Sequence, residues 1–223
     1  MPPPYVLAGA SFGGLNSRIY GDLYPKQVAG MVLIDSAPED ELRRAPKFYL
    51  GRTAPRFLWR PLWAAFDAAA LVGLVRLMES SPVQGKEPAQ LTREEIIAAL
   101  RAQPKSVAGN AAVDLALPES FDEAKAVGRL GDFPLIVLTA GRPFDFRNAE
   151  WNKEAAAYQP VWIHEIQPKL LKLSTRGRQI VVPTATHATT PKEVILGAIR
   201  DAGRTGPWRS DKPLDSHSDP ANK

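Results

Sequence analysis

Residues 5–14 read Tyr-Val-Leu-Ala-Gly-Ala-Ser-Phe-Gly-Gly, and this stretch decides the fold. It opens on a continuous apolar run, 5–9, without alternation, which is typical of a strand covered on both faces in a parallel sheet. A glycine-rich turn follows. Apolar residues then recur every four positions, which predicts a helix that ends before Pro25: Leu15, Ile19 and Leu23.

Three further apolar runs have the same character and strand length: residues 31–35, 133–141 and 178–182. Helical patterns separate them, and this alternation predicts an α/β fold in which a mostly parallel sheet is flanked by helices. The helical segment 149–173 contains Pro160 and Pro168, which should break or kink it. The last helix is expected to begin near Pro191 and to end at Gly203.

The region 38–131 differs because its patterns are helical and it contains no convincing strand. Two capping boxes mark expected helix starts: Thr92 with Glu95, and Ser120 with Glu123. We therefore expect a domain over 1–202 in which 38–131 is a helical cap insertion. Residues 203–223 are polar and lack periodicity, which predicts a disordered tail.

The composition is that of an ordinary globular protein and excludes several classes of site. The 223 residues include no cysteine, so disulfide scaffolds, cysteine nucleophiles and thiolate metal sites are excluded. The net charge of +4 is not gathered into a basic block, so no nucleic-acid partner is expected. Nucleotide motifs and histidine pairs at metal-ligand spacing are missing from the sequence, so neither a cofactor nor a metal is predicted.

No signal-peptide pattern is present, and the compartment is unknown, with the cytoplasm as the default expectation. The longest apolar stretch, 62–78, is interrupted by Asp67, which argues against a membrane span. An ordinary packed cap helix is the plainer interpretation of this stretch. The alternative is a lid that contacts apolar acyl groups or a lipid surface.

A serine motif lies between the first strand and the first helix. Residues 9–13, Gly-Ala-Ser-Phe-Gly, match the pattern Gly-x-Ser-x-Gly in the strand–turn–helix context that gives it meaning. Glycines on both sides suit a turn too tight for side chains, which would hold Ser11 in a strained conformation with its hydroxyl exposed. The backbone N–H of Phe12, at the helix N-terminus, is the candidate oxyanion donor.

A nucleophilic serine needs a base, and the chain offers three histidines. His217 lies in the predicted tail, and His164 lies within a helical segment. His187 follows the fourth strand, and ligand chemistry in open α/β sheets gathers beyond the carboxyl ends of strands. His187 is therefore the candidate base.

These features resemble the α/β-hydrolase family over roughly residues 4–202. The likeness is carried by the serine turn, the strand ends at Asp35 and Gly141, and the order Ser…Asp…His. It implies that Ser11 is the nucleophile and that His187 is the general base and acid. The implied activity is cleavage of carboxylic esters through an acyl-enzyme, with a small-molecule ester as substrate.

The acid of the implied triad is either Asp35 or Asp145, because the family places its acid at either of the two corresponding strand ends. Asp35 ends the second strand directly and is better fixed, so we favour it slightly. Asp145 lies on a loop beside Arg142 and Arg147. A strand-end acid can also simply cap nearby N–H groups.

The chain departs from the family in that only four residues precede the strand at Tyr5, where family members have further strands and a second oxyanion donor. The fold is therefore expected to be N-terminally truncated, with the first strand as an apolar edge. Such an edge favours a homo-oligomer. The alternative function is a non-catalytic remnant that is completed by self-association. Thr186 also replaces the glycine that usually precedes the histidine.

Overall fold

The computed structural model describes residues 2–36, 38–39, 56–75, 87, 91–92, 95–97, 100, 103–146 and 148–204. Contacts divide the chain into two compact units, of which the first combines Met1–Leu50 with Ser120–Lys223 and the second is Gly51–Glu119. The expected domain boundaries, with a cap over 38–131, stay predictions. Positions 205–223 of the expected tail lie outside the described residues.

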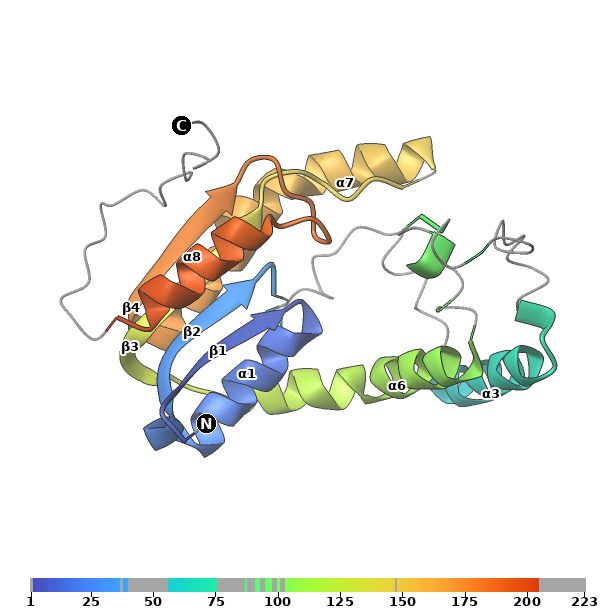
Figure 1. The fold of residues 1–223 in the computed structure, drawn as a ribbon, viewed down its shortest axis with the longest axis horizontal. Coiled ribbons are helices and arrows are strands. Elements are labelled where there is room, and N and C mark those ends of the chain that lie inside the picture. Colours follow the sequence, from blue (N-terminus) through green and yellow to red (C-terminus); the bar gives the residue numbers. More distant parts are fainter. Residues whose placement is uncertain are drawn as a thin grey trace. The chain divides into compact units, whose positions relative to one another are not determined.

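The first unit is built on a four-stranded sheet in which all neighbouring strands are parallel (Figure 1). The spatial order follows the chain: β1 Tyr5–Ala10, β2 Val28–Ile34, β3 Gly131–Ala140 and β4 Ser174–Val182. The predicted α/β fold with a parallel sheet is confirmed. β2 and β4 begin three and four residues earlier than their apolar runs indicate. Ala29 and Gly30 separate Val28 from the apolar run of β2, and the first four residues of β4 are polar or small.

Helical elements pack on both faces of the sheet. On one face lie α1, Phe12–Leu23, and the 3₁₀ segment η5, Gln167–Leu173, over alternate residues of the central strands: Met31, Leu33, Leu135 and Val137. On the other face α8, Lys192–Ala202, covers Val32, Ile34, Ile136 and Leu138. A strand whose successive side chains are buried on both faces reads as a continuous apolar run, which is why these strands could be predicted.

Between β3 and β4 the chain is helical but not uniformly α-helical. The α-helix α7, Ala149–Val161, passes into a π-helical turn, Trp162–Ile166, and then into η5. The changes of helix type occur next to Pro160 and Pro168, as predicted, because a proline removes a backbone donor and crowds the preceding turn. A short 3₁₀ turn, η1, Pro25–Gln27, joins α1 to β2.

The second unit contains α3, Arg56–Leu71, and most of α6, Pro104–Ala126. Its small core joins Ala70, Val75 and Val107. The capping box at Thr92 is confirmed by two reciprocal bonds with Glu95, of 2.8 and 3.2 Å. The helix start predicted at Ser120 is wrong, because α6 runs through that position.

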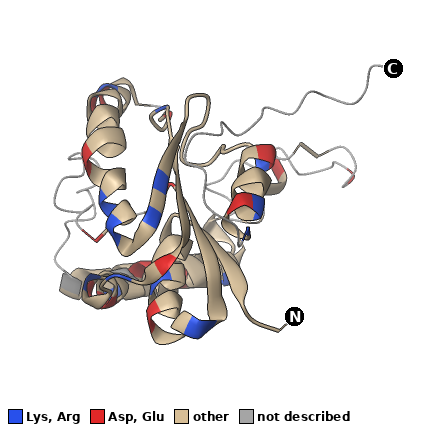
Figure 2. Ribbon diagram, turned by 90° about the vertical axis from the view of Figure 1, so that its left-hand side faces the viewer, with Lys and Arg blue, Asp and Glu red and all other residues tan. Residues whose placement is uncertain are grey.

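A capping box begins a helix only where the preceding backbone is not helical, and α6 continues without interruption through Pro118 and Ser120. Lys and Arg as well as Asp and Glu occur along the helices, as the blue and red segments of the ribbon show (Figure 2). Within the described residues, no helix is both long and apolar enough to cross a membrane.

Candidate active site

The candidate site lies at the carboxyl ends of the strands, where the sheet register brings distant residues together. Ala10, the last residue of β1, is paired with Ile34, which is paired in turn with Leu138. The ladder extends one residue further, because the amide of Ser11 donates to Ile34 O at 3.0 Å and the amide of Asp35 donates to Leu138 O at 2.7 Å. The backbones of Ser11 and Asp35 are therefore held by ladder hydrogen bonds of the same sheet, each to the neighbouring strand.

Ser11 joins β1 to α1 with a strained backbone. Its φ is 50° and its ψ is −122°, a sparsely populated positive-φ conformation that costs a non-glycine residue about 1–3 kcal/mol. The Ser11 carbonyl accepts hydrogen bonds from Gly14 N at 3.0 Å and from the buried Ser36 hydroxyl at 3.1 Å. The strain expected of a tight strand-to-helix turn is confirmed.

The glycines of this turn have unequal roles. A Cβ atom at Gly9 would strike the carbonyl group of Gly13, and one at Gly14 would strike the Ser36 side chain. A Cβ atom at Gly13 would meet no heavy atom within 4 Å in the described part of the chain, apart from the backbone of its own helix. The steric reason given for the second glycine of the motif is therefore wrong, and it applies to Gly14 instead.

Phe12 is the first residue of α1. The first N–H groups of an α-helix have no partner within the helix, and the helix dipole makes this end favourable for negative charge. The Phe12 N–H therefore stands directly after the serine, at the end of the helix suited to an oxyanion.

The Asp35 carboxylate is buried and its oxygens receive three donors. Oδ1 accepts the Ala140 N–H at 2.9 Å and the Trp162 Nε1–H at 2.7 Å. Oδ2 lies 2.7 Å from Nδ1 of His187. Asp35 also has a positive φ of 43°, so its backbone is strained where the chain leaves β2.

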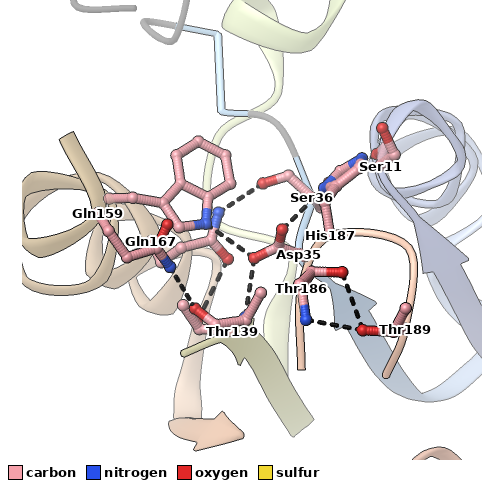
Figure 3. A network of polar contacts seen from close by, with 11 residues as sticks. Ser11, Asp35, Ser36, Thr139, Gln159, Gln167, Thr186, His187 and Thr189 are labelled. Carbon is pink, nitrogen blue, oxygen red and sulfur yellow. Dashed lines mark hydrogen bonds and ion pairs between the residues drawn. The ribbon is translucent and has the colours of Figure 1, made fainter. Parts of the chain in front are cut away.

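His187 reaches this carboxylate from the loop after β4 (Figure 3). Because an ionised carboxylate only accepts hydrogen bonds, this contact assigns the proton to Nδ1 and leaves Nε2 available as a base. The loop is held by Thr189 Oγ1, which lies 2.8 Å from both the amide and the hydroxyl of Thr186. These contacts close the turn from Thr186 to Thr189, on which His187 lies.

The other sequence candidates lie elsewhere. Asp145 Oδ1 accepts a hydrogen bond from Asn152 Nδ2 at 3.0 Å on the exposed loop before α7. Of the two candidate acids, the structure therefore brings Asp35 to His187. His164 is exposed on the π-helical turn, and His217 lies outside the described residues.

Several residues around the acid could not be identified from the sequence. Gln167, fully buried, donates from Nε2 to Ser36 O at 2.7 Å, and its Oε1 lies 3.4 Å from the Thr139 hydroxyl. Gln179 Nε2 donates to the same hydroxyl at 3.0 Å. Glutamines are ordinary surface residues, so no signal in one sequence marks them as buried. Across the described positions, no group of three or more histidines and carboxylates is arranged to hold a metal ion.

The chain thus has an α/β fold with a parallel sheet, and a serine, a histidine and an aspartate lie at the carboxyl ends of its strands. Solved structures that match the chain include a carboxylesterase of the thaumarchaeon Nitrososphaera gargenis, with 14% identity, 87% of this chain covered, 59% of that chain and a TM-score of 0.39. An epoxide hydrolase of Bacillus megaterium matches with 12% identity, coverage of 81% and 62%, and a TM-score of 0.37.

The protein DbjA matches with 14% identity, coverage of 81% and 60%, and a TM-score of 0.46. The chain spans 55–62% of the length of the structures that it matches. No protein-family model and no curated protein sequence matches it. At these TM-scores the likeness concerns the fold in outline, and the chemistry is argued below from the geometry of the site.

Proposed function

We propose that this chain is a serine hydrolase that cleaves carboxylic esters through an acyl-enzyme. Ser11 is the nucleophile, His187 is the general base and acid, and Asp35 orients the histidine. The observation that carries the proposal is the 2.7 Å contact between Nδ1 of His187 and the buried Asp35 carboxylate, at the end of the sheet where Ser11 begins α1.

In the proposed reaction the Ser11 hydroxyl adds to the ester carbonyl carbon while His187 Nε2 takes its proton. The Phe12 N–H stabilises the oxyanion, and the resulting imidazolium is stabilised by Asp35. His187 then gives the proton to the leaving alkoxide, and an alcohol departs. Water, deprotonated by His187, hydrolyses the acyl-serine, releases the carboxylic acid and restores the Ser11 hydroxyl.

The burial and hydrogen bonding of Asp35 favour this role over that of a simple cap. A cap would be satisfied by the Ala140 amide, whereas Asp35 also presents its second oxygen to a half-exposed imidazole. The side chain of His187 is 38% exposed, so its ring is accessible to a substrate on the solvent side.

The test is labelling of the full chain with a fluorophosphonate, which reacts with activated serines, followed by mapping of the modified peptide by mass spectrometry. Label on Ser11 that is lost in His187→Ala is the expected result. Ser17→Ala is the matched control, because Ser17 lies on the same helix and its hydroxyl already donates a hydrogen bond to Gly13 O at 2.9 Å. Folded wild-type protein that takes no label would refute the proposal.

The alternative function, a non-catalytic chain completed by self-association, is favoured by one observation. Among the described strands, β1 stands at the edge of the sheet, and Tyr5, Val6 and Leu7 on it are only partly buried. Sedimentation velocity distinguishes the two proposals when combined with labelling: a dimer without label supports the alternative, and a labelled monomer rejects it. Contact with a lipid surface through 62–78 stays a prediction, and positions 76–78 lie outside the described residues.

A further inference from the structure

We propose that Trp162 is a positioning residue for the acid of the site: its indole N–H fixes which oxygen of Asp35 faces His187. This inference rests on the proposed hydrolase function and adds to it a residue that the serine motif does not indicate. It begins from the 2.7 Å bond between Trp162 Nε1 and Asp35 Oδ1, which joins residues 127 positions apart in the sequence.

The two carboxylate oxygens of Asp35 have different hydrogen-bond partners. Oδ1 receives two donors, the Ala140 N–H and the indole N–H, and Oδ2 receives His187. With one donor alone on Oδ1, the carboxylate can rotate about its Cβ–Cγ bond and still keep a hydrogen bond, because that torsion is broad. Two donors from different directions define the plane of the carboxylate. The position of Oδ2, and hence the direction of the imidazole, is then set.

The indole is itself held in place by the π-helical turn of which Trp162 is the first residue. π-Helical turns are rare, and they alter the direction in which side chains project compared with a continuous α-helix. Trp162 is 6% exposed and packs against Tyr158, with ring centroids 6.2 Å apart. The ring therefore has little freedom to withdraw its N–H from the carboxylate.

Three glutamine side chains fasten the segment that contains Trp162 to its surroundings. Gln159 Nε2 donates to Ala140 O at 2.7 Å, and Gln167 Nε2 donates to Ser36 O at 2.7 Å. Gln159 thus binds one end of the segment to the last residue of β3, and Gln167 binds the other end to the chain just after β2. Gln179, on β4, donates to Ile163 O at 2.9 Å, within the turn. These three hydrogen bonds, one buried and two partly buried, hold the segment with Trp162 against the strand ends where Asp35 lies.

A tryptophan retained for packing alone would need any acceptor for its N–H, since a buried donor without a partner is costly. Here the acceptor is the carboxylate that contacts the proposed base. Loss of the N–H should therefore disturb the orientation of His187 and slow acylation, whereas substrate binding should change little.

The experiment compares two replacements of Trp162 in the full chain. Trp162→Phe keeps a buried ring without the N–H, and benzothienylalanine, introduced at the same position, keeps the shape of tryptophan with sulfur in place of the N–H. Trp151→Phe is the matched control, because Trp151 lies on α7 and is 45% exposed. The readouts are kcat and KM on a p-nitrophenyl ester, the rate of fluorophosphonate labelling at Ser11, and the melting temperature of each protein.

We expect both replacements to lower kcat and the labelling rate about 10- to 100-fold, as loss of a hydrogen bond to a charged group predicts, with KM unchanged and the control active. Wild-type rates in the benzothienylalanine protein would overturn the inference and would assign any effect of Trp162→Phe to packing. If the wild-type protein is labelled and both replacements keep its kcat and labelling rate, the inference about Trp162 is overturned and the hydrolase function is not. Folded wild-type protein without label overturns the hydrolase function, and the inference with it.

Discussion

Asp35 and His187 are 152 positions apart in the sequence, and Oδ2 of the first lies 2.7 Å from Nδ1 of the second. The pair forms because parallel strands place their carboxyl ends at one edge of the sheet, so that the residue after β2 and the loop after β4 meet there. Asp35 is nearly fully buried and His187 is half-exposed, which is the arrangement expected of an orienting acid and a working base.

The two candidate acids can be separated by single substitutions. Asp35→Asn removes the charge but keeps the shape, and the amide can present an N–H to Nδ1, which favours the wrong tautomer of His187. We expect kcat on a p-nitrophenyl ester to fall by about 10⁴-fold. Asp145→Asn is the control, because Asp145 contacts Asn152 on an exposed loop, and its kcat should stay within about twofold. Equal losses in the two variants would contradict the assignment of Asp35.

Replacement of Gly13 and of Gly14 by alanine should change the free energy of unfolding in opposite directions. Gly13→Ala adds a Cβ where the described residues leave space and improves helix propensity, so the free energy of unfolding should rise by up to about 1 kcal/mol. Gly14→Ala drives a Cβ into the buried Ser36 side chain and should lower it by about 1–3 kcal/mol. Urea unfolding followed by circular dichroism measures both. The prediction fails if Gly13→Ala is the more destabilising change.

The His187 loop depends on one hydroxyl. Thr189→Val removes the oxygen that lies 2.8 Å from both the amide and the hydroxyl of Thr186, so the histidine should be held less firmly. Since the turn is exposed, we expect a loss of at most about 1 kcal/mol in stability and a fall in kcat of about fivefold. Thr190→Val, one position further, should change neither quantity. Kinetics with unaltered kcat in Thr189→Val would show that the turn is held by other contacts.

Gln167 should contribute more to the free energy of unfolding than a surface glutamine does. Gln167→Leu deprives the Ser36 carbonyl of its donor in a fully buried place, which should cost about 1–3 kcal/mol of unfolding free energy. Lys172→Leu, on the exposed side of η5, should stay within about 0.5 kcal/mol. Chemical denaturation of the two variants side by side provides the measurement, and an unchanged midpoint for Gln167→Leu would count against a stabilising role.

The parallel sheet could be predicted because each central strand is a continuous apolar run, and the serine turn could be predicted because glycine and serine mark it in the sequence. The histidine could be placed only by its position after a strand. The choice between Asp35 and Asp145 could not be made from the sequence, because both follow strands and the deciding quantity is the approach of His187 in space.

The supporting residues escaped prediction for a different reason. Trp162 lies in the π-helical turn, and Gln159 and Gln167 lie on either side of it, in α7 and η5. A change of helix type shifts side-chain directions without altering the periodicity that is read from a sequence. The prolines near this turn indicated a break, but not the direction in which the side chains would point. The start of α6 was misplaced at Ser120 because a capping motif inside a helix has the same letters as one at its beginning.

The extension of the sheet ladder by one residue at Ser11 and Asp35 has a kinetic consequence. An amide proton in a strand ladder exchanges with deuterium only when the pairing opens, and a ladder between buried central strands opens only with the whole structure. The Asp35 amide, bonded to Leu138 O, should exchange as slowly as the amides in the middle of β2 and β3. On heating, the Asp35 end of the sheet would then open together with the fold in a single transition, without an earlier loosening of the site.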